Sequence, residues 1–234
     1  MKFGFYHKNL MKKHFGILML LLLTTLASHA DVTNLTVSTT SNTLIPDGTV
    51  FGITSTNVIS GMSGVTTNIT VNLDITGGFS GDLYAYLLSP TGTMVVLVNR
   101  TGMNSGNNSG YSDAGFNVTF DAASANNIHN YQTFSPVYNS GQLTGTWATD
   151  SRAIDPRSIP SAFDAGPTGN TLANYYGSNP NGAWTLFVAD LSTGGQSTLA
   201  SWSMSVVTVP EPQTWTILGG GLTVCWLMIR RRRN

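Results

Sequence analysis

Apolar and polar residues alternate with a period of two through the middle of the chain, and no stretch of residues 31–208 keeps the 3.6-residue period of an amphipathic helix. The clearest example is segment 65–75, where every second residue from Ile69 onward is apolar and Asn, Thr or Asp stands between. The same alternation, or a more continuous apolar run, marks four further segments: 93–98, 116–120, 184–188 and 202–206. A period of two predicts strands with one buried face and one solvated face. The two more continuously apolar segments, 93–98 and 184–188, predict central strands.

Turn-forming residues separate these segments at 77–78, 89–92 and 194–195, where Gly and Pro supply positive or preset φ angles. Short strands with such turns predict an all-β fold, an antiparallel sandwich or jelly roll. Segment 102–110, rich in Asn, Ser and Gly, predicts a mobile loop. Segment 122–181 lacks clear periodicity, but so long a stretch without structure is unusual within a domain, so short strands are expected there.

The N-terminal 30 residues have the features of a signal peptide. Four lysines precede an apolar run at 15–23, and small side chains at Ser28 and Ala30 occupy the positions that a signal peptidase reads. Cleavage is therefore expected between Ala30 and Asp31. An uncleaved membrane anchor is the alternative, although the apolar run is short for one.

The C-terminal residues 209–234 combine Pro210-Glu211-Pro212, a mostly apolar run at 215–229 and four consecutive arginines. A helix of that run would rise about 22 Å, less than the ~30 Å hydrocarbon core of a bilayer, so a temporary anchor fits better than a permanent one. The lysines before the first apolar run and the arginines after the second both favour the cytoplasmic side of the membrane. This predicts that the stretch between the two apolar runs is exported.

This tail resembles the PEP-CTERM sorting signal of Gram-negative bacteria. The resemblance rests on Pro210-Glu211-Pro212, the short apolar helix and the arginine cluster. It implies an inner-membrane stage, recognition and cleavage by an exosortase near the tripeptide, and delivery to the cell surface or extracellular matrix. In that family the tripeptide is a substrate feature and not a catalytic site.

Charge and cysteine usage exclude two classes of protein. Residues 31–211 contain all 11 acidic residues and only three basic ones, Arg100, Arg152 and Arg157, which gives a net charge of −8. Such a stretch has no basic footprint for nucleic acid. The single cysteine, Cys225, lies in the tail, so no disulfide can stabilise the exported part, and a structural zinc site is not expected.

Residues 43–208 resemble the P domain, or Homo B domain, that follows the catalytic domain of proprotein convertases. Four segments carry the resemblance in order: Ile45-Pro46-Asp47-Gly48; the strand ending at Ile75 with Gly81-Asp82-Leu83 and 89–93; 179–190; and 194–204. It implies a jelly-roll-like, galactose-binding-like β-sandwich, preceded here by a short segment, 31–42. Trp184 and Trp202 are expected to be buried, whereas 148–171 departs from the family pattern as an insertion would.

No catalytic residue is predicted. His129 is the only histidine of the exported part, and its Asn-rich surroundings indicate an exposed loop residue and not the base of a Ser-His-Asp triad. The abundant aspartates leave a calcium site open, and Asp82 and Asp190 are the candidate ligands. Structural or merely solvated aspartates are the alternative. Five tyrosines expected to be exposed could stack on sugar rings or simply pack under long loops: Tyr111, Tyr131, Tyr138, Tyr175 and Tyr176.

Two functions follow from these patterns and resemblances. The first is an exported, exosortase-sorted surface or matrix protein with a non-catalytic sandwich and a structural or adhesive role in exopolysaccharide or biofilm. The alternative is an accessory module that binds or stabilises a separate subtilisin-like serine protease, as P domains do within convertases. Signal peptidase and exosortase would be processing partners in either case.

Overall fold

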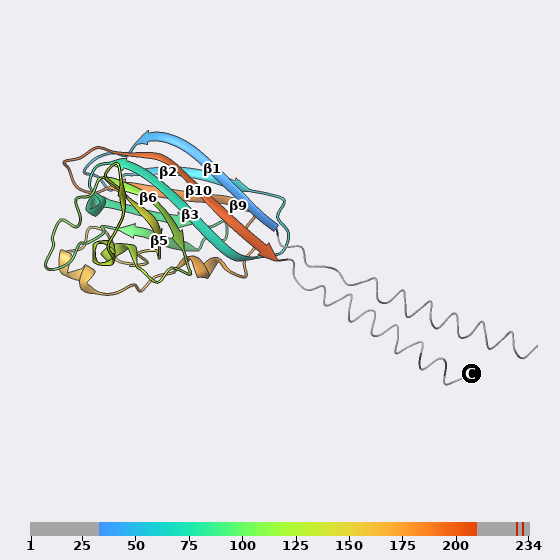
Figure 1. The fold of residues 1–234 in the computed structure, drawn as a ribbon. Helices are drawn as coiled ribbons and strands as arrows, with labels where there is room; N and C mark the ends of the chain where they lie inside the picture. Colours follow the sequence, from blue (N-terminus) through green and yellow to red (C-terminus); the bar gives the residue numbers. More distant parts are fainter. Residues whose placement is uncertain (1–32, 210–227, 229–230, 232–234) are drawn as a thin grey trace, which may run out of the picture. The chain divides into compact units, whose positions relative to one another are not determined.

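The structure is a computed structural model that describes residues 33–209 together with Met228 and Arg231. Residues 33–209 form two packed β-sheets (Figure 1). The six-stranded sheet has the order β1 (Thr33–Leu44), β10 (Ser197–Val209), β3 (Val65–Gly77), β6 (Gly115–Asp121), β8 (Gln142–Trp147) and β7 (Tyr138–Asn139). The four-stranded sheet has the order β2 (Ile53–Ile59), β9 (Gly182–Asp190), β4 (Leu83–Leu88) and β5 (Met94–Asn99).

The alternating sequence segments are strands with the expected faces. In β3, Ile69, Val71 and Leu73 are fully buried, while the residues between them are partly exposed. The apolar side of β10 is aligned with that of β3, because Met204 pairs with Val71 in an antiparallel register. The predicted all-β sandwich is therefore confirmed. It departs from a purely antiparallel arrangement in one pair, since β6 and β8 run parallel.

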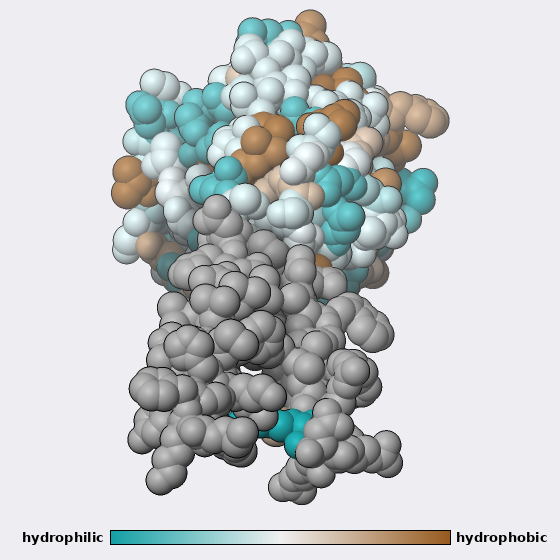
Figure 2. Space-filling view, turned by 90° about the vertical axis from the view of Figure 1, so that its right-hand side faces the viewer, coloured by the Kyte–Doolittle hydropathy of each residue, from teal (hydrophilic) through white to brown (hydrophobic). Residues whose placement is uncertain are grey.

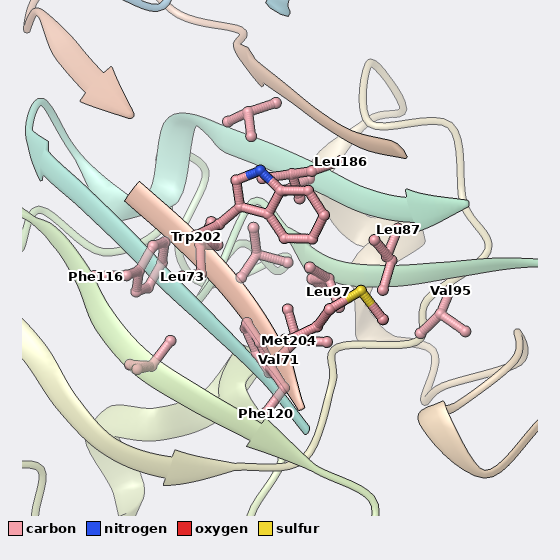
Figure 3. Packing of buried hydrophobic residues seen from close by; sticks show 14 of the residues in the cluster. Val71, Leu73, Leu87, Val95, Leu97, Phe116, Phe120, Leu186, Trp202 and Met204 are labelled. Carbon is pink, nitrogen blue, oxygen red and sulfur yellow. The ribbon is translucent and has the colours of Figure 1, made fainter. Parts of the chain in front are cut away.

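The core lies between the two sheets (Figure 3). Trp184 of β9 and Trp202 of β10 are fully buried, as their strand phase predicts. The indole N–H of Trp202 also donates to Ser55 Oγ of β2 at 2.8 Å, which links the two sheets. Each buried Trp or Phe removes ~150–250 Å² from water, so these rings are major contributors to folding. A disulfide-free sandwich of this size is stabilised by such packing.

Two expectations about segments need correction. Residues 33–42, taken as a segment preceding the domain, form most of β1 at the edge of the six-stranded sheet. Segment 102–110, expected as a mobile loop, contains a local bridge between Asn104 and Asn107, and Met103 is buried.

The region of weak periodicity, 122–181, contains β7 and β8, which confirms the expected short strands. It also contains three 3₁₀ helices. These helices are η2 (Ile128–Phe134), η3 (Pro160–Asp164) and η4 (Leu172–Tyr175); a fourth, η1 (Ser80–Asp82), precedes β4. The insertion-like part also covers the edge of the four-stranded sheet, because the backbone N–H groups of Asp150 and Ser151 donate to carbonyls of β5. Tertiary contacts therefore order a segment that has little periodicity of its own.

The expected signal peptide and sorting signal lie outside the described residues. That holds for the proposed cleavage position at Ala30 and Asp31, for Pro210-Glu211-Pro212 and for nearly all of the apolar run after them. Within the part of the chain that is described, no helix has the length and hydropathy needed to cross a membrane. The described surface in Figure 2 is mostly white and teal, with hydrophobic residues in separate small groups.

Candidate functional site

The fold brings the two predicted calcium ligands, Asp82 and Asp190, to the same end of the sandwich. Asp82 ends η1 just before β4, and Asp190 is the last residue of β9. Because β4 and β9, the two inner strands of the four-stranded sheet, pair with Leu83 opposite Asp190, the two aspartates lie at the same end of this strand pair. The backbone N–H of Leu191 donates to the Asp82 carbonyl at 2.9 Å and fixes this approach.

A third aspartate, Asp47, belongs to the same group and was not among the predicted ligands. It lies in the loop between β1 and β2, and its Oδ2 accepts a long hydrogen bond of 3.3 Å from the backbone N–H of Gly194. The neighbouring N–H of Thr49 donates to the Asp190 carbonyl, so this loop is held against the end of β9. We call Asp47, Asp82 and Asp190 the acidic loop cluster.

One arginine supplies the positive charge of the acidic loop cluster. The guanidinium of Arg100 lies 3.5 Å from Asp82 Oδ1 and also donates to Ser192 Oγ and to the Gly81 carbonyl. Asp190 has no ion-pair partner among the described residues. Its Oδ2 accepts from Ser197 Oγ at 2.8 Å, whereas no described donor completes a hydrogen bond to its buried Oδ1.

Burial and mutual repulsion change the protonation of these carboxyl groups. Burial raises the pKa of Asp190 to about 6, and the negative charges of Asp82 and Asp47 act in the same direction, although nearby Ser197 and Ser192 lower it. The pKa of Asp82 is also raised, mainly by burial and against the opposing influence of Ser192 and Arg100. Each pKa moves in the direction expected of a carboxyl group that is removed from water.

A second polar cluster surrounds His129, which is not the exposed loop residue that its sequence context predicted. His129 is 1% exposed, and its ring stacks on Phe163 at a centroid distance of 6.1 Å. Its Nδ1 lies 2.8 Å from Asp150 Oδ2, and the other carboxylate oxygen, Oδ1, accepts from Arg152 at 3.0 Å. The Asn99 backbone N–H donates to Oδ2 as well. We call His129, Asp150 and Arg152 the buried ion cluster.

The His129–Asp150 contact is not that of a catalytic base. In a serine hydrolase triad the second ring nitrogen faces a hydroxyl nucleophile in an accessible cleft. Here Nε2 lies 2.9 Å from the backbone carbonyl of Met103, within the buried interior. Ser151, the residue after Asp150, is buried and its hydroxyl is hydrogen-bonded to Thr149. The contact therefore joins loops to one another.

The tyrosines expected to be exposed fall into two groups. Tyr131 and Tyr175 are 0% and 1% exposed and are packing residues, so their predicted exposure is wrong. Their hydroxyl groups are used internally, by Asp113 at 2.6 Å and by the Leu87 carbonyl at 2.7 Å. Tyr138 and Tyr176 are exposed as expected, and Tyr111 is half-buried. Packing under the loops, which was the alternative to sugar stacking, therefore applies to Tyr131 and Tyr175.

A different set of aromatic residues, which sequence reasoning missed, forms the outer face of the four-stranded sheet. Tyr84, Tyr86 and Phe187 are partly exposed on neighbouring strands β4 and β9. Tyr86 and Phe187 stack with centroids 5.0 Å apart and an interplanar angle of 18°. Burial by these neighbours raises the pKa of Tyr84 to about 12. We call these three residues the aromatic face.

A sequence signal for the aromatic face existed. Segment 83–88 alternates as the other strands do, but its second set of residues is aromatic or aliphatic instead of Ser, Thr or Asn. The outer positions of β10 in the six-stranded sheet, Ser203 and Ser205, show the usual polar pattern. An apolar residue at a solvent-facing strand position therefore marks the unusual surface.

Comparison with known proteins agrees with this fold. The family model described as "Proprotein convertase P-domain" matches residues 66–149. No curated protein matches the sequence. Two solved structures are similar, a serine protease of Aeromonas sobria and a complex of that protease with its chaperone ORF2.

Both structures share 16% identity with this chain, with TM-scores of 0.42 and 0.41 over 78% and 82% of its length. The chain spans only 28% and 29% of those proteins. The match of residues 66–149 confirms the resemblance from β3 to β8 and for the two residues that follow β8. The matched residues lie within a β-sandwich of two sheets, and the match covers residues 66–149 of it.

Proposed function

We propose that this protein is a non-catalytic accessory module that binds and stabilises a separate subtilisin-like serine protease. The observation that carries the proposal is the P-domain match of residues 66–149. P domains accompany such proteases, and this was the alternative that the sequence left open. The structural or adhesive role in exopolysaccharide, which was the first expectation, has no feature of the described residues in its favour.

The aromatic face is the surface that suits a protein partner. Tyr and Phe are enriched in the buried centres of protein interfaces, because they contribute a large contact area at low cost in side-chain entropy. The stacked rings of Tyr86 and Phe187 face each other, so one flat side of each ring is covered within the pair. Exposed apolar neighbours extend the surface at its margins: Val58 and Met94.

Binding of a protease would be tested with the full chain and two matched variants. One replaces the aromatic face (Tyr84→Ser, Tyr86→Ser and Phe187→Ser), and the control replaces polar residues on the other sheet (Ser203→Ala and Ser205→Ala). Wild type and control should recover a secreted subtilisin-like protease, identified by mass spectrometry, and lengthen its half-life at elevated temperature. The aromatic variant should do neither.

Two results would oppose the proposal. Equal protease recovery by all three proteins would remove the aromatic face as the contact surface. Recovery of exopolysaccharide without any subtilisin-like protease would favour the structural role instead.

We also propose that the protein acts outside the cell, on the basis of its terminal sequence patterns alone. Export with a signal peptide removed at Ala30 and sorting by an exosortase at Pro210-Glu211-Pro212 would place the sandwich at the surface or in the matrix. Replacing the tripeptide by Ala-Ala-Ala should remove the protein from the surface fraction. Unchanged fractionation would contradict the sorting step.

A further inference from the structure

We propose that β1 pairs in antiparallel orientation with β1 of a second copy of this chain, which joins two six-stranded sheets into one. β1 lies at the edge of its sheet, and among the described residues it pairs with β10 alone (Figure 1). An edge strand presents a row of unpaired backbone N–H and C=O groups, which is a template for another strand. Its composition, its self-complementarity and its half-buried apolar residues favour a second copy of the same strand as the partner.

The other edges of the two sheets offer less to a partner strand. The edge at β5 is covered, because the backbone N–H groups of Asp150 and Ser151 donate to carbonyls of β5 at 2.9 and 3.0 Å. The edge at β7 has two residues. The edge at β2 has seven residues, against twelve in β1, and its inward residues Asn57 and Ile59 are already buried. β1 is therefore the longest uncovered edge in the described part of the chain.

Over residues 33–40, β1 lacks the features that keep an edge strand unpaired in natural proteins. Those features are charged side chains, proline, a bulge or a very short strand. This stretch has no charged residue and no proline, and its register with β10 is continuous from Thr33 to Thr40. A register shift occurs only between Thr40 and Thr43. Eight residues of β1 are therefore regular and unprotected.

The same eight residues are complementary to a second copy of themselves. In an antiparallel pair, directly opposite residues lie on the same face of the sheet. With Thr36 opposite its counterpart in the second copy, Leu35 meets Val37 on the inner face. In that register Asn34 meets Ser38 on the solvent face, so both faces match and no charges are opposed. Such a pair is two-fold symmetric, which closes the assembly at two copies.

The half-buried residues Leu35 and Val37 give an apolar reason for the pairing. Both lie on the inner side of β1 and pack against the core, but no strand lies beyond β1 to cover them. Val37 pairs with Met204 of β10, which pairs in turn with Val71 of β3, and both of these inner residues are almost fully buried. A second β1 would bring Leu35 and Val37 of the two copies together and remove apolar surface from water.

The dimer should be weak and should not compete with binding of a protease. Two paired strands of eight residues form a small interface, so we expect a reversible dimer with a Kd on the order of 10 µM. The paired strands belong to the six-stranded sheet, whereas the aromatic face lies on β4 and β9 of the other sheet. The aromatic face therefore stays outside the dimer interface in both copies.

Sedimentation velocity of the full chain at about 1–200 µM tests the pairing, in a non-ionic detergent because both terminal segments contain apolar runs. Two double variants place like charges across the interface at exposed positions of β1: Thr36→Lys with Ser38→Lys, and Thr36→Glu with Ser38→Glu. Like charges opposite each other are destabilising, so each variant alone should raise the Kd of the dimer by about tenfold or more. An equimolar mixture of the two should recover the dimer, because opposite charges then meet.

The matched control is Asn117→Lys with Thr119→Lys. It puts two lysines at the same spacing on β6, three strands from the edge, and should dimerise as wild type does. A monomeric wild type throughout the concentration range would overturn the proposal. So would a dimer that persists unchanged in the lysine and glutamate variants alone, because association would then occur elsewhere on the chain. Neither result depends on a protease partner, so the test is separate from that of the proposed function.

Discussion

Two buried carboxylates, Asp150 and Asp190, show how differently the same group is accommodated within one domain. Both are 0% exposed at the margin of the four-stranded sheet. Asp150 contacts Arg152, His129 and a backbone N–H, so both of its oxygens are paired. Asp190 has one hydroxyl partner, an orphan oxygen and two further carboxylates as neighbours.

The difference separates a fully paired cluster from one that is not fully paired. The buried ion cluster is complete within the protein, and it joins the 99–103, 127–134 and 148–165 segments that lack strong periodicity. The acidic loop cluster is incomplete, because Asp190 Oδ1 has no hydrogen-bond partner among the described residues, and burial raises the pKa of Asp190. Buried charge by itself therefore says little about function; the presence or absence of internal partners is the informative feature.

The largest effect should come from breaking the complete cluster. Asp150→Ala leaves Arg152 buried without its counter-ion and His129 Nδ1 without its hydrogen-bond partner, and should lower the free energy of unfolding by about 3–5 kcal/mol. Urea unfolding followed by circular dichroism would measure it. Stability within error of wild type would show that the buried ion cluster is not structural.

A smaller effect should appear as a pH dependence that Asp190 introduces. Its folded-state pKa of about 6 lies above the ordinary value of 3.8, so the folded state holds this proton more tightly. The resulting stabilisation is complete below about pH 3.8 and is lost as the pH rises through 6; it amounts to on the order of 2 kcal/mol.

The measurement is urea unfolding without calcium between pH 5 and pH 7.5. Wild type should lose stability relative to Asp190→Asn across this window, because the amide does not titrate. Parallel pH profiles for the two proteins would contradict the raised pKa of Asp190.

A still smaller effect is expected from the one hydroxyl that serves Asp190. Ser197→Ala removes the 2.8 Å hydrogen bond to Oδ2 and should cost about 1 kcal/mol at pH 7.5. In the Asp190→Asn background the same substitution should cost less, since no charge is then left unpaired. Equal costs in both backgrounds, measured as a double-mutant cycle, would mean that the carboxylate charge is not what Ser197 stabilises.

The smallest effect is expected at an exposed ion pair, which has the same residue types as the buried Arg152–Asp150 pair. Arg157 and Asp155 lie 2.7 Å apart, but their side chains are 67% and 50% exposed. Arginine lowers the pKa of Asp155 to about 2. Solvent screens such pairs, so Asp155→Asn should leave the unfolding midpoint unchanged within error. A measurable decrease in the unfolding midpoint would show that this exposed pair stabilises the protein despite solvent screening.

Long-range contacts decided several features that local patterns could not show. His129 lies in an Asn-rich segment typical of an exposed loop. It is nevertheless buried, and two residues from later in the chain, Asp150 and Phe163, contact its ring. Tyr131 and Tyr175 are covered in the same way. Side-chain exposure in segments without periodicity depends on which distant segment packs above them.

The sequence by itself determined five of the strands, β3, β5, β6, β9 and β10, together with the buried faces of β3, β9 and β10 and the conspicuous aspartates Asp82 and Asp190. It could do so because alternation along a strand is a local property that reports directly on burial. The tertiary structure alone decided that β6 pairs in parallel with β8, that Asp47 joins Asp82 and Asp190, and that His129 is enclosed. These features depend on the approach of residues far apart in the chain. A local pattern of polar and apolar residues does not specify which distant residues come into contact.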